Sequence, residues 1–171
     1  VDKPLAVHLR DAERLIALAE STGTPLTVFQ NRRFDGDFLT VRKLVESGDM
    51  GEVWRFESRF EWRSTRPRPA WKSDTPSAEG GGVAYDVGSH LLDQAVQLLG
   101  PVVDSYGEFD RRKPGAVNDD DSFIALTHEN GVRSHLTVSS LVAQPRVRFR
   151  VLGSRGEYAT WGLDGQETQL K

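Results

Sequence analysis

The sequence of 171 residues contains no cysteine. This absence excludes a disulfide framework and any metal site built on thiolates, and it fits a protein of the reducing cytoplasm. No apolar run approaches the roughly 18 residues of a membrane-spanning helix, so no contact with a membrane is expected. Neither charge is in large excess, with 22 basic against 25 acidic residues. Without a basic block, no nucleic-acid partner is expected.

Two further absences concern ligands. The chain lacks the Gly-x-Gly-x-x-Gly turn that holds the pyrophosphate of a dinucleotide. Three consecutive glycines do occur at positions 80–82, but without that spacing they only weakly indicate a phosphate loop. We expect them to form a flexible lead-in to the helix that follows. No group of His, Asp and Glu residues has the spacing of metal ligands, so no metal site is expected.

The first 31 residues predict one helix and one strand. Apolar residues recur at helical spacing from Leu9 to Ala19, and Gly23 is placed to end this helix as a left-handed cap. Residues 25–29 predict a short buried strand. A helix that leads tightly into an apolar strand is typical of the second half of a βαβ unit, whose first strand would precede Val1. We therefore expect the chain to be a piece of a longer protein.

Residues 32–171 predict a sheet with covering helices. Asp35 is placed to begin a second helix that Gly48 ends, and residues 89–99 form a third helical pattern. Strict alternation in residues 52–62 predicts a strand with one core face and one charged face. The core face consists of Trp54, Phe56, Phe60 and Trp62. Further strands are expected at residues 102–109, 122–128, 132–142 and 146–160, with a tail strand around 168–170. The expected fold is α/β (α+β), a mostly antiparallel open sheet with helices on one face.

The charged face of this sheet has two candidate roles. It can simply be solvated, or it can pair with a second copy across a two-fold axis, because charges of both signs alternate along it. The residues expected on this face are Arg55, Glu57, Arg59, Glu61, Arg133, His135, Thr137, Ser139, Arg148 and Arg150.

Four polar residues are candidates for a site. Asp86 and His90 lie four positions apart, which places a carboxylate and an imidazole on one helical face, close enough to act on one substrate. Alternatively, Asp86 caps the helix and His90 is a satisfied polar residue of its first turn. Asn31 and Arg32 directly follow residues 25–29, at the strand end where α/β sheets bind ligands. A solvated capping segment is the alternative for these two.

The proline-rich stretch of residues 63–79 supplies two more candidates. A loop of this length inside a compact domain is typically functional or disordered. Trp71 and Lys72 can contact a cofactor or substrate there. Alternatively, Trp71 anchors the loop or a subunit contact.

Three ordered motifs resemble one enzyme family. Asp2-Lys3-Pro4 resembles the Glu-Lys-Pro motif of the Gfo/Idh/MocA oxidoreductases, the glucose–fructose oxidoreductase and inositol dehydrogenase family, with Asp2 in place of the usual Glu. Residues 80–93 resemble its Gly-Gly-Gly…Asp-x-Gly-x-His-x-x-Asp motif, and residues 153–158 are similar to a late strand-turn of the family. Residues 30–39 look like the branch of NADP-dependent scyllo-inositol dehydrogenases. The resemblance spans essentially the whole chain.

The resemblance implies two domains and a catalytic set. Residues 1–31 would be the last helix and strand of a Rossmann nucleotide-binding domain, and residues 32–171 a substrate-binding domain whose open sheet face forms subunit contacts. The cofactor would be NAD or NADP, with NADP favoured by the branch, and Lys3 would lie beside the nicotinamide. In hydride transfer from a polyol or sugar hydroxyl, His90 would accept the proton and Lys3 would stabilise the alkoxide charge. Asp86 would orient His90 or bind a neighbouring substrate hydroxyl.

We therefore expect the substrate and oligomerisation domain of an NAD(P)-dependent sugar or polyol dehydrogenase. By itself this chain is expected to be inactive, because the glycine turn that binds the pyrophosphate lies outside it. The alternative is a non-catalytic dimerisation or ligand-sensing module with the same fold.

Overall fold

A six-stranded open sheet forms the body of the structure, a computed structural model that describes residues 1–64 and 69–162. Its strands are β1 (Val53–Glu61), β2 (Val102–Asp110), β3 (Asp121–His128), β4 (Arg133–Ser139), β5 (Phe149–Gly153) and β6 (Gly156–Thr160). They are ordered β2-β3-β4-β1-β5-β6, and neighbours run antiparallel except β1 and β4, which pair in parallel. The predicted sheet is confirmed; the tail strand expected around residues 168–170 lies outside the described residues.

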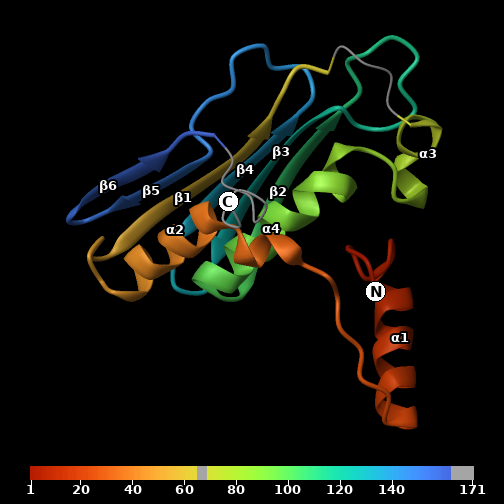
Figure 1. Ribbon diagram of the computed structural model, residues 1–171, viewed down its shortest axis with the longest axis horizontal. Helices are drawn as coiled ribbons and strands as arrows, with labels where there is room; N and C mark the ends of the chain where they lie inside the picture. Colours follow the sequence, from red (N-terminus) through yellow and green to blue (C-terminus); the bar gives the residue numbers. More distant parts are fainter. Residues whose placement is uncertain (65–68, 163–171) are drawn as a thin grey trace, which may run out of the picture.

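The helices cover one face of this sheet or stand apart from it. The helical segments are α1 (Leu9–Thr22), η1 (Asn31–Phe34), α2 (Gly36–Glu46), α3 (Ala70–Ser73), η2 (Ser77–Glu79), η3 (Ala84–Gly88) and α4 (Ser89–Leu99). Figure 1 shows α2 and α4 lying across one face, while α1 stands away from the sheet beside the N-terminus. Helices on one face are thus confirmed. In the described part of the chain, no helix is long and apolar enough to cross a membrane.

The N-terminal segment only partly follows its prediction. Gly23 caps α1 with φ 63°, a left-handed conformation that glycine adopts without a Cβ clash. No residue of α1 is buried, and its Leu9 is 76% exposed. Residues 25–29 do not form the predicted strand; their backbone bonds to another segment are with Val1. That prediction is wrong because an apolar run becomes a strand only beside a neighbouring strand that pairs its backbone.

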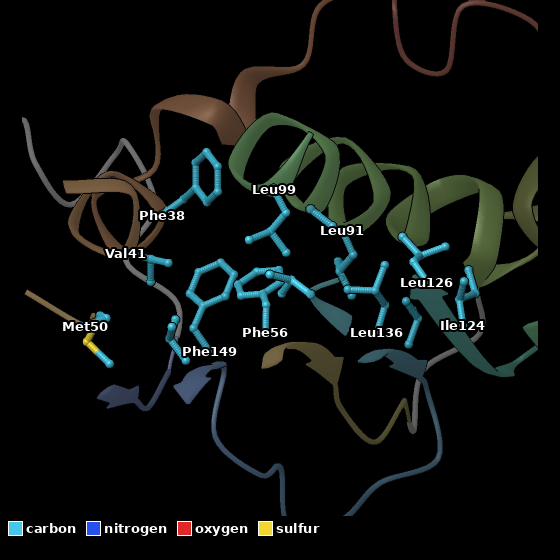
Figure 2. Packing of buried hydrophobic residues seen from close by; sticks show 14 of the residues in the cluster. Phe38, Val41, Met50, Phe56, Leu91, Leu99, Ile124, Leu126, Leu136 and Phe149 are labelled. Atoms are coloured by element: carbon cyan, nitrogen blue, oxygen red, sulfur yellow. The ribbon is translucent and has the colours of Figure 1, made fainter. Parts of the chain in front are cut away.

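Three phenylalanine rings and a larger number of aliphatic side chains fill the layer between the helices and the sheet (Figure 2). Phe56 of β1 and Phe149 of β5 are fully buried, with ring centroids 5.7 Å apart. Phe38 of α2 lies 6.3 Å from Phe149, centroid to centroid. Leu91 of α4 and Leu136 of β4 extend the same cluster towards β3. These contacts attach both helices to the centre of the sheet.

Trp54 does not belong to this core, although alternation places it there. Its side chain is 50% exposed. The pairing of β1 with β5 shifts between Val53 and Arg55, which lie opposite the adjacent residues Gly153 and Leu152. Trp54 is therefore the extra residue of a β-bulge, and a bulge turns a side chain away from the face that strict alternation assigns to it.

Arg148 is also on the opposite face from the one predicted. Because β5 begins only at Phe149, the strand alternation does not extend to Arg148, and its side chain is 4% exposed on the helix-covered face. Its guanidinium lies 4.0 Å from the ring centroid of Phe60 and 3.5 Å, at Nε, from Oδ2 of Asp37. A buried charge is tolerated when such partners surround it.

The face of the sheet that no helix covers carries a network of charged residues. This was predicted, although Arg148 is not part of it. Glu57 is nearly buried beneath Arg55, Arg59 and Arg150, whose guanidinium groups all approach its carboxylate. Burial acts to raise the pKa of Glu57, but the hydrogen bond from Arg59 and the charges of the arginines outweigh it, so the pKa lies below its ordinary value. Glu157 binds Arg150 at 2.8 Å, so three guanidinium groups meet two carboxylates on this part of the face.

The bulge generates a stability prediction. Phe56→Ala removes a fully buried ring and should lower the free energy of unfolding by about 3–5 kcal/mol. Trp54→Ala, two residues earlier in the same strand, should change it by only about 0.5 kcal/mol, because half of this ring is in solvent. Urea unfolding of both variants measures the difference. Equal losses for the two residues would show that Trp54 is in the core after all.

Candidate active site

Lys3 and Asp86 meet although they are 83 positions apart in the sequence. The Lys3 ammonium donates a hydrogen bond to the backbone carbonyl of Asp86 and lies 3.3 Å from its Oδ1. The segment that carries Lys3 is anchored next to this contact, since the Tyr85 hydroxyl donates to the Val7 carbonyl at 3.1 Å. The N-terminal segment is thus held against η3, which places Lys3 beside the residues of the second motif.

A second cation reaches the same carboxylate. Lys72, the third residue of α3, places its Nζ 2.6 Å from Oδ2 of Asp86. Burial acts to raise the pKa of Asp86, but the hydrogen bond from Lys72 and the charge of Lys3 outweigh it, and the pKa lies below its ordinary value. Asp86 is therefore a carboxylate between two ammonium groups at neutral pH. Trp71 lies in the same short helix, and its side chain is outside the described part of the structure.

Asp86 does not cap α4, which was the alternative role for it. It lies in η3, a single π-helical turn directly before α4, whose N-cap is Gly88. The sequence pattern does not predict this turn. Isolated π turns inside helices are rare and recur at functional sites. Here the turn presents the carboxylate to the two lysines, whereas a capping residue directs its side chain at backbone N–H groups.

His90 is buried and neutral. It is 6% exposed, and its Nδ1 lies 3.1 Å from Oε1 of Gln30. Burial, followed by the charges of Lys3 and Arg32, lowers the pKa of His90 to about 4. Because an amide oxygen only accepts hydrogen bonds, we assign the tautomer with the proton on Nδ1, which leaves the lone pair of the neutral ring on Nε2. Gln30, and not Asp86, is therefore the residue that holds Nδ1.

The same face of α4 holds the segment that contains Asn31 and Arg32. Gln94 donates to the carbonyl of Arg32 at 2.8 Å. Asp93 binds the guanidinium of Arg33 through both carboxylate oxygens. Arg32 itself pairs with Asp35 at 2.9 Å, and the positive charge of Arg32 contributes to lowering the pKa of His90. The predicted substrate residues in η1 and the predicted catalytic residue His90 are thus on adjoining elements.

Sequence reasoning missed Gln30, Arg33, Asp93 and Gln94 as contributors to this arrangement. One signal was available, because Asp93 and Gln94 follow His90 by three and four positions and so share its helical face. Gln30 is adjacent to Asn31, but its contact with His90 spans 60 positions, and no local pattern encodes such a pairing.

The three glycines before η3 are closely packed, so the expected flexible lead-in is wrong. A Cβ on Gly81 would lie 1.8 Å from the Thr75 carbonyl oxygen, and one on Gly82 would lie 1.8 Å from Oδ1 of Asp119. Gly82 also has φ 103°, which disfavours any other residue. Glycine is required here because other groups approach the backbone closely.

Two further features delimit the site. Among the described residues, no group of three His, Cys, Asp or Glu side chains is arranged to hold a metal ion. A mostly apolar pocket of about 330 Å³ lies next to η3, and its lining residues are Pro4, Ala84, Tyr85, Ser89, Leu92, Phe109 and Ile124. The polar chemistry is therefore concentrated at Lys3, Lys72, Asp86 and His90. This group can donate hydrogen bonds from ammonium groups to an oxygen and accept a proton on a neutral imidazole.

Comparisons with known proteins identify the family. The model of the GFO/IDH/MocA C-terminal domain matches residues 38–159. The whole chain is 42% identical to 49% of the uncharacterized oxidoreductase YdgJ of Escherichia coli K12. It is 28% identical to 47% of scyllo-inositol 2-dehydrogenase (NADP(+)) IolW of Bacillus subtilis, again over the full chain. A solved oxidoreductase from Bacillus cereus is 31% identical and superimposes with a TM-score of 0.82, over 99% of this chain and 48% of that one.

The chain therefore belongs to the Gfo/Idh/MocA family and represents its C-terminal part, as the motifs predict. It spans about half the length of the curated relatives that it matches.

The environment of His90 generates a titration prediction. Its ring should stay neutral down to about pH 4, measured from the chemical shift of its Cε1 proton. Lys3→Met should raise this pKa, because the Lys3 charge disfavours the imidazolium. Between about pH 6.5 and 4 the unfolded chain binds a proton that the folded chain does not, so stability should fall as the pH falls through this window. A midpoint near the ordinary value of 6.5 would contradict the described environment.

Proposed function

We propose that this chain is the substrate-binding and oligomerisation part of an NAD(P)-dependent oxidoreductase that acts on a secondary alcohol of a polyol or sugar, or on the matching ketone. We place the boundary with a nucleotide-binding domain near residue 31, because α1 has no buried residue and lies apart from the sheet. The observation that carries the proposal is the convergence of Lys3, Asp86 and His90 from two separate segments.

The residues present fit the reacting end of a nicotinamide cofactor. The two ammonium groups can stabilise the charge of an alcohol oxygen that loses its proton, and the neutral imidazole can accept that proton. The sequence contains no glycine turn for the pyrophosphate at the other end of the cofactor. Lys3 is the proposed neighbour of the nicotinamide, and Lys72 and Trp71 are proposed contacts on the α3 side. When bound, the cofactor supplies the acceptor for the hydride that leaves the alcohol carbon.

Residues of this chain accept the proton of the substrate hydroxyl and stabilise the charge that its loss leaves. Nε2 of His90 carries the free lone pair and accepts the proton of the substrate hydroxyl, and in the reverse direction it returns that proton. Lys3 donates a hydrogen bond to the same oxygen and stabilises its developing negative charge. Asp86 holds the ammonium group of Lys3 in place, because its carboxylate oxygen Oδ1 lies 3.3 Å from it.

The polarity of the surroundings supports a substrate with several hydroxyl groups. Asn31 and Arg32 lie on η1, next to His90, and can bind hydroxyls that do not react. The name of the relative IolW specifies scyllo-inositol and NADP. We extend this to a polyol or sugar substrate and favour NADP for the protein that contains this chain.

Substitution of His90 tests the proposal in the full-length protein. His90→Ala should lower kcat about 10²–10⁴-fold, since general acid–base catalysis contributes about this much, and should leave NADP binding nearly intact. His8→Ala is the matched control, because His8 is exposed and makes no capping hydrogen bond to α1. NADPH absorbance measures turnover of a polyol such as scyllo-inositol. A near-normal kcat for His90→Ala would refute the assignment of His90 as the base.

We also propose that the uncovered sheet face associates with a second copy, because it is broad and basic residues alternate on it with carboxylates. Arg133→Glu, at an exposed position paired with Arg55, should shift the species seen by sedimentation velocity towards monomer. Arg42→Glu on α2 is the control and should sediment like the wild type. A wild-type protein that stays monomeric at high concentration would contradict this proposal.

A further inference from the structure

The loop between β2 and β3 buries three polar residues, Asn118, Asp119 and Asp120, and the first two contact the segments that carry the site. Asn118 is 4% exposed and Asp119 is 3% exposed, although neither has a role in the hydrophobic core. Such residues remain buried only when their polar groups are fully engaged. Their hydrogen-bond partners show which segments of the chain these two residues hold in place.

Asn118 holds the backbone that carries Lys72. Its Nδ2 lies 2.9 Å from the carbonyl oxygen of Lys72, 2.8 Å from that of Thr75 and 3.3 Å from that of Ser73. All three partners are acceptors, so the position requires a donor. A helix of four residues does not stabilise itself, because nucleation of a single turn is unfavourable. The amide of Asn118 supplies the tertiary contact that fixes this turn.

Asp119 holds the turn that carries Asp86. Its Oδ2 accepts hydrogen bonds from the backbone N–H of Ala84 and from the Ser122 hydroxyl, both at 2.8 Å. Its carbonyl accepts the N–H of Val83 at 3.1 Å. These bonds fix the first residues of η3, two positions before Asp86.

We propose that Asn118 and Asp119 are positioning residues that together set the Lys72–Asp86 contact of the site. Asn118 fixes the backbone that carries Lys72, and Asp119 fixes the backbone of the turn that carries Asp86. The long Lys72 side chain loses less conformational entropy on forming this contact when its backbone is already in place. The catalytic consequence rests on the proposed function, but the contact itself can be tested without turnover.

The test measures the pKa of the Asp86 carboxyl by carbon NMR in the chain. Lys72→Met should raise this pKa, because the hydrogen bond that lowers it is removed. Asn118→Ala should raise it in the same direction, and in the Lys72→Met background it should have no further effect. Asn118→Ser, which keeps a short donor, replaces Asn118→Ala if the latter does not fold.

Asn130→Ala is the matched control. Asn130 donates the same kind of amide hydrogen bond, at 3.0 Å to the Leu99 carbonyl at the other end of α4, so its loss should leave the pKa of Asp86 unchanged. If Asn118 only stabilised the fold, Asn118→Ala and Asn130→Ala would have the same effect on the pKa of Asp86. An unchanged pKa of Asp86 in folded Asn118→Ala would overturn the proposal.

Kinetics of the full-length protein separate this proposal from the proposed function. Asn118→Ala and Lys72→Met should each lower kcat/KM, by up to about 10²-fold for a displacement near 1 Å, and their effects should not add. Additive losses would overturn the positioning role. Absence of turnover in the wild type would contradict the proposed function alone, because the pKa measurement does not depend on it.

Discussion

The buried guanidinium of Arg148 joins the sheet to both covering helices and to the site. It donates to the Ser58 hydroxyl of β1 at 2.6 Å and to Gln94 of α4 at 3.2 Å, and it faces Asp37 of α2. Burial lowers the pKa of Arg148 to about 10, so it is still charged at neutral pH. Gln94 connects Arg148 to η1, because the amide nitrogen of Gln94 donates a hydrogen bond to the carbonyl of Arg32. The segment beside His90 therefore depends on a charge in the interior.

The sequence pattern predicted the fold well where alternation and helical spacing had no competitor. The sheet, its covering helices and the Gly23 cap follow directly from these periodicities. Trp54 and Arg148 were assigned to the wrong faces because alternation assumes an uninterrupted strand, whereas a bulge and a strand end intervene. Composition also misled for Arg148, since a charge predicts exposure unless its partners are known.

The site was only half predictable for a different reason. Motif resemblance named Lys3, Asp86 and His90, and the proline-rich stretch supplied Lys72, but the distances among them depend on contacts between residues far apart in the chain. Gln30 and Asn118 act through such contacts, and neither carries a local signal. The glycines before η3 are explained in the same way, since it is the neighbouring groups of Thr75 and Asp119 that exclude a Cβ.

We propose that Lys3 and His90 act on one hydroxyl group. A crystal structure of the full-length protein with NADP and a bound polyol tests it most directly. We expect one substrate oxygen within hydrogen-bond distance of both the Lys3 ammonium and Nε2 of His90, with Nδ1 still held by Gln30. A polyol bound away from these two groups, or Nε2 of His90 engaged by the protein itself, would contradict it.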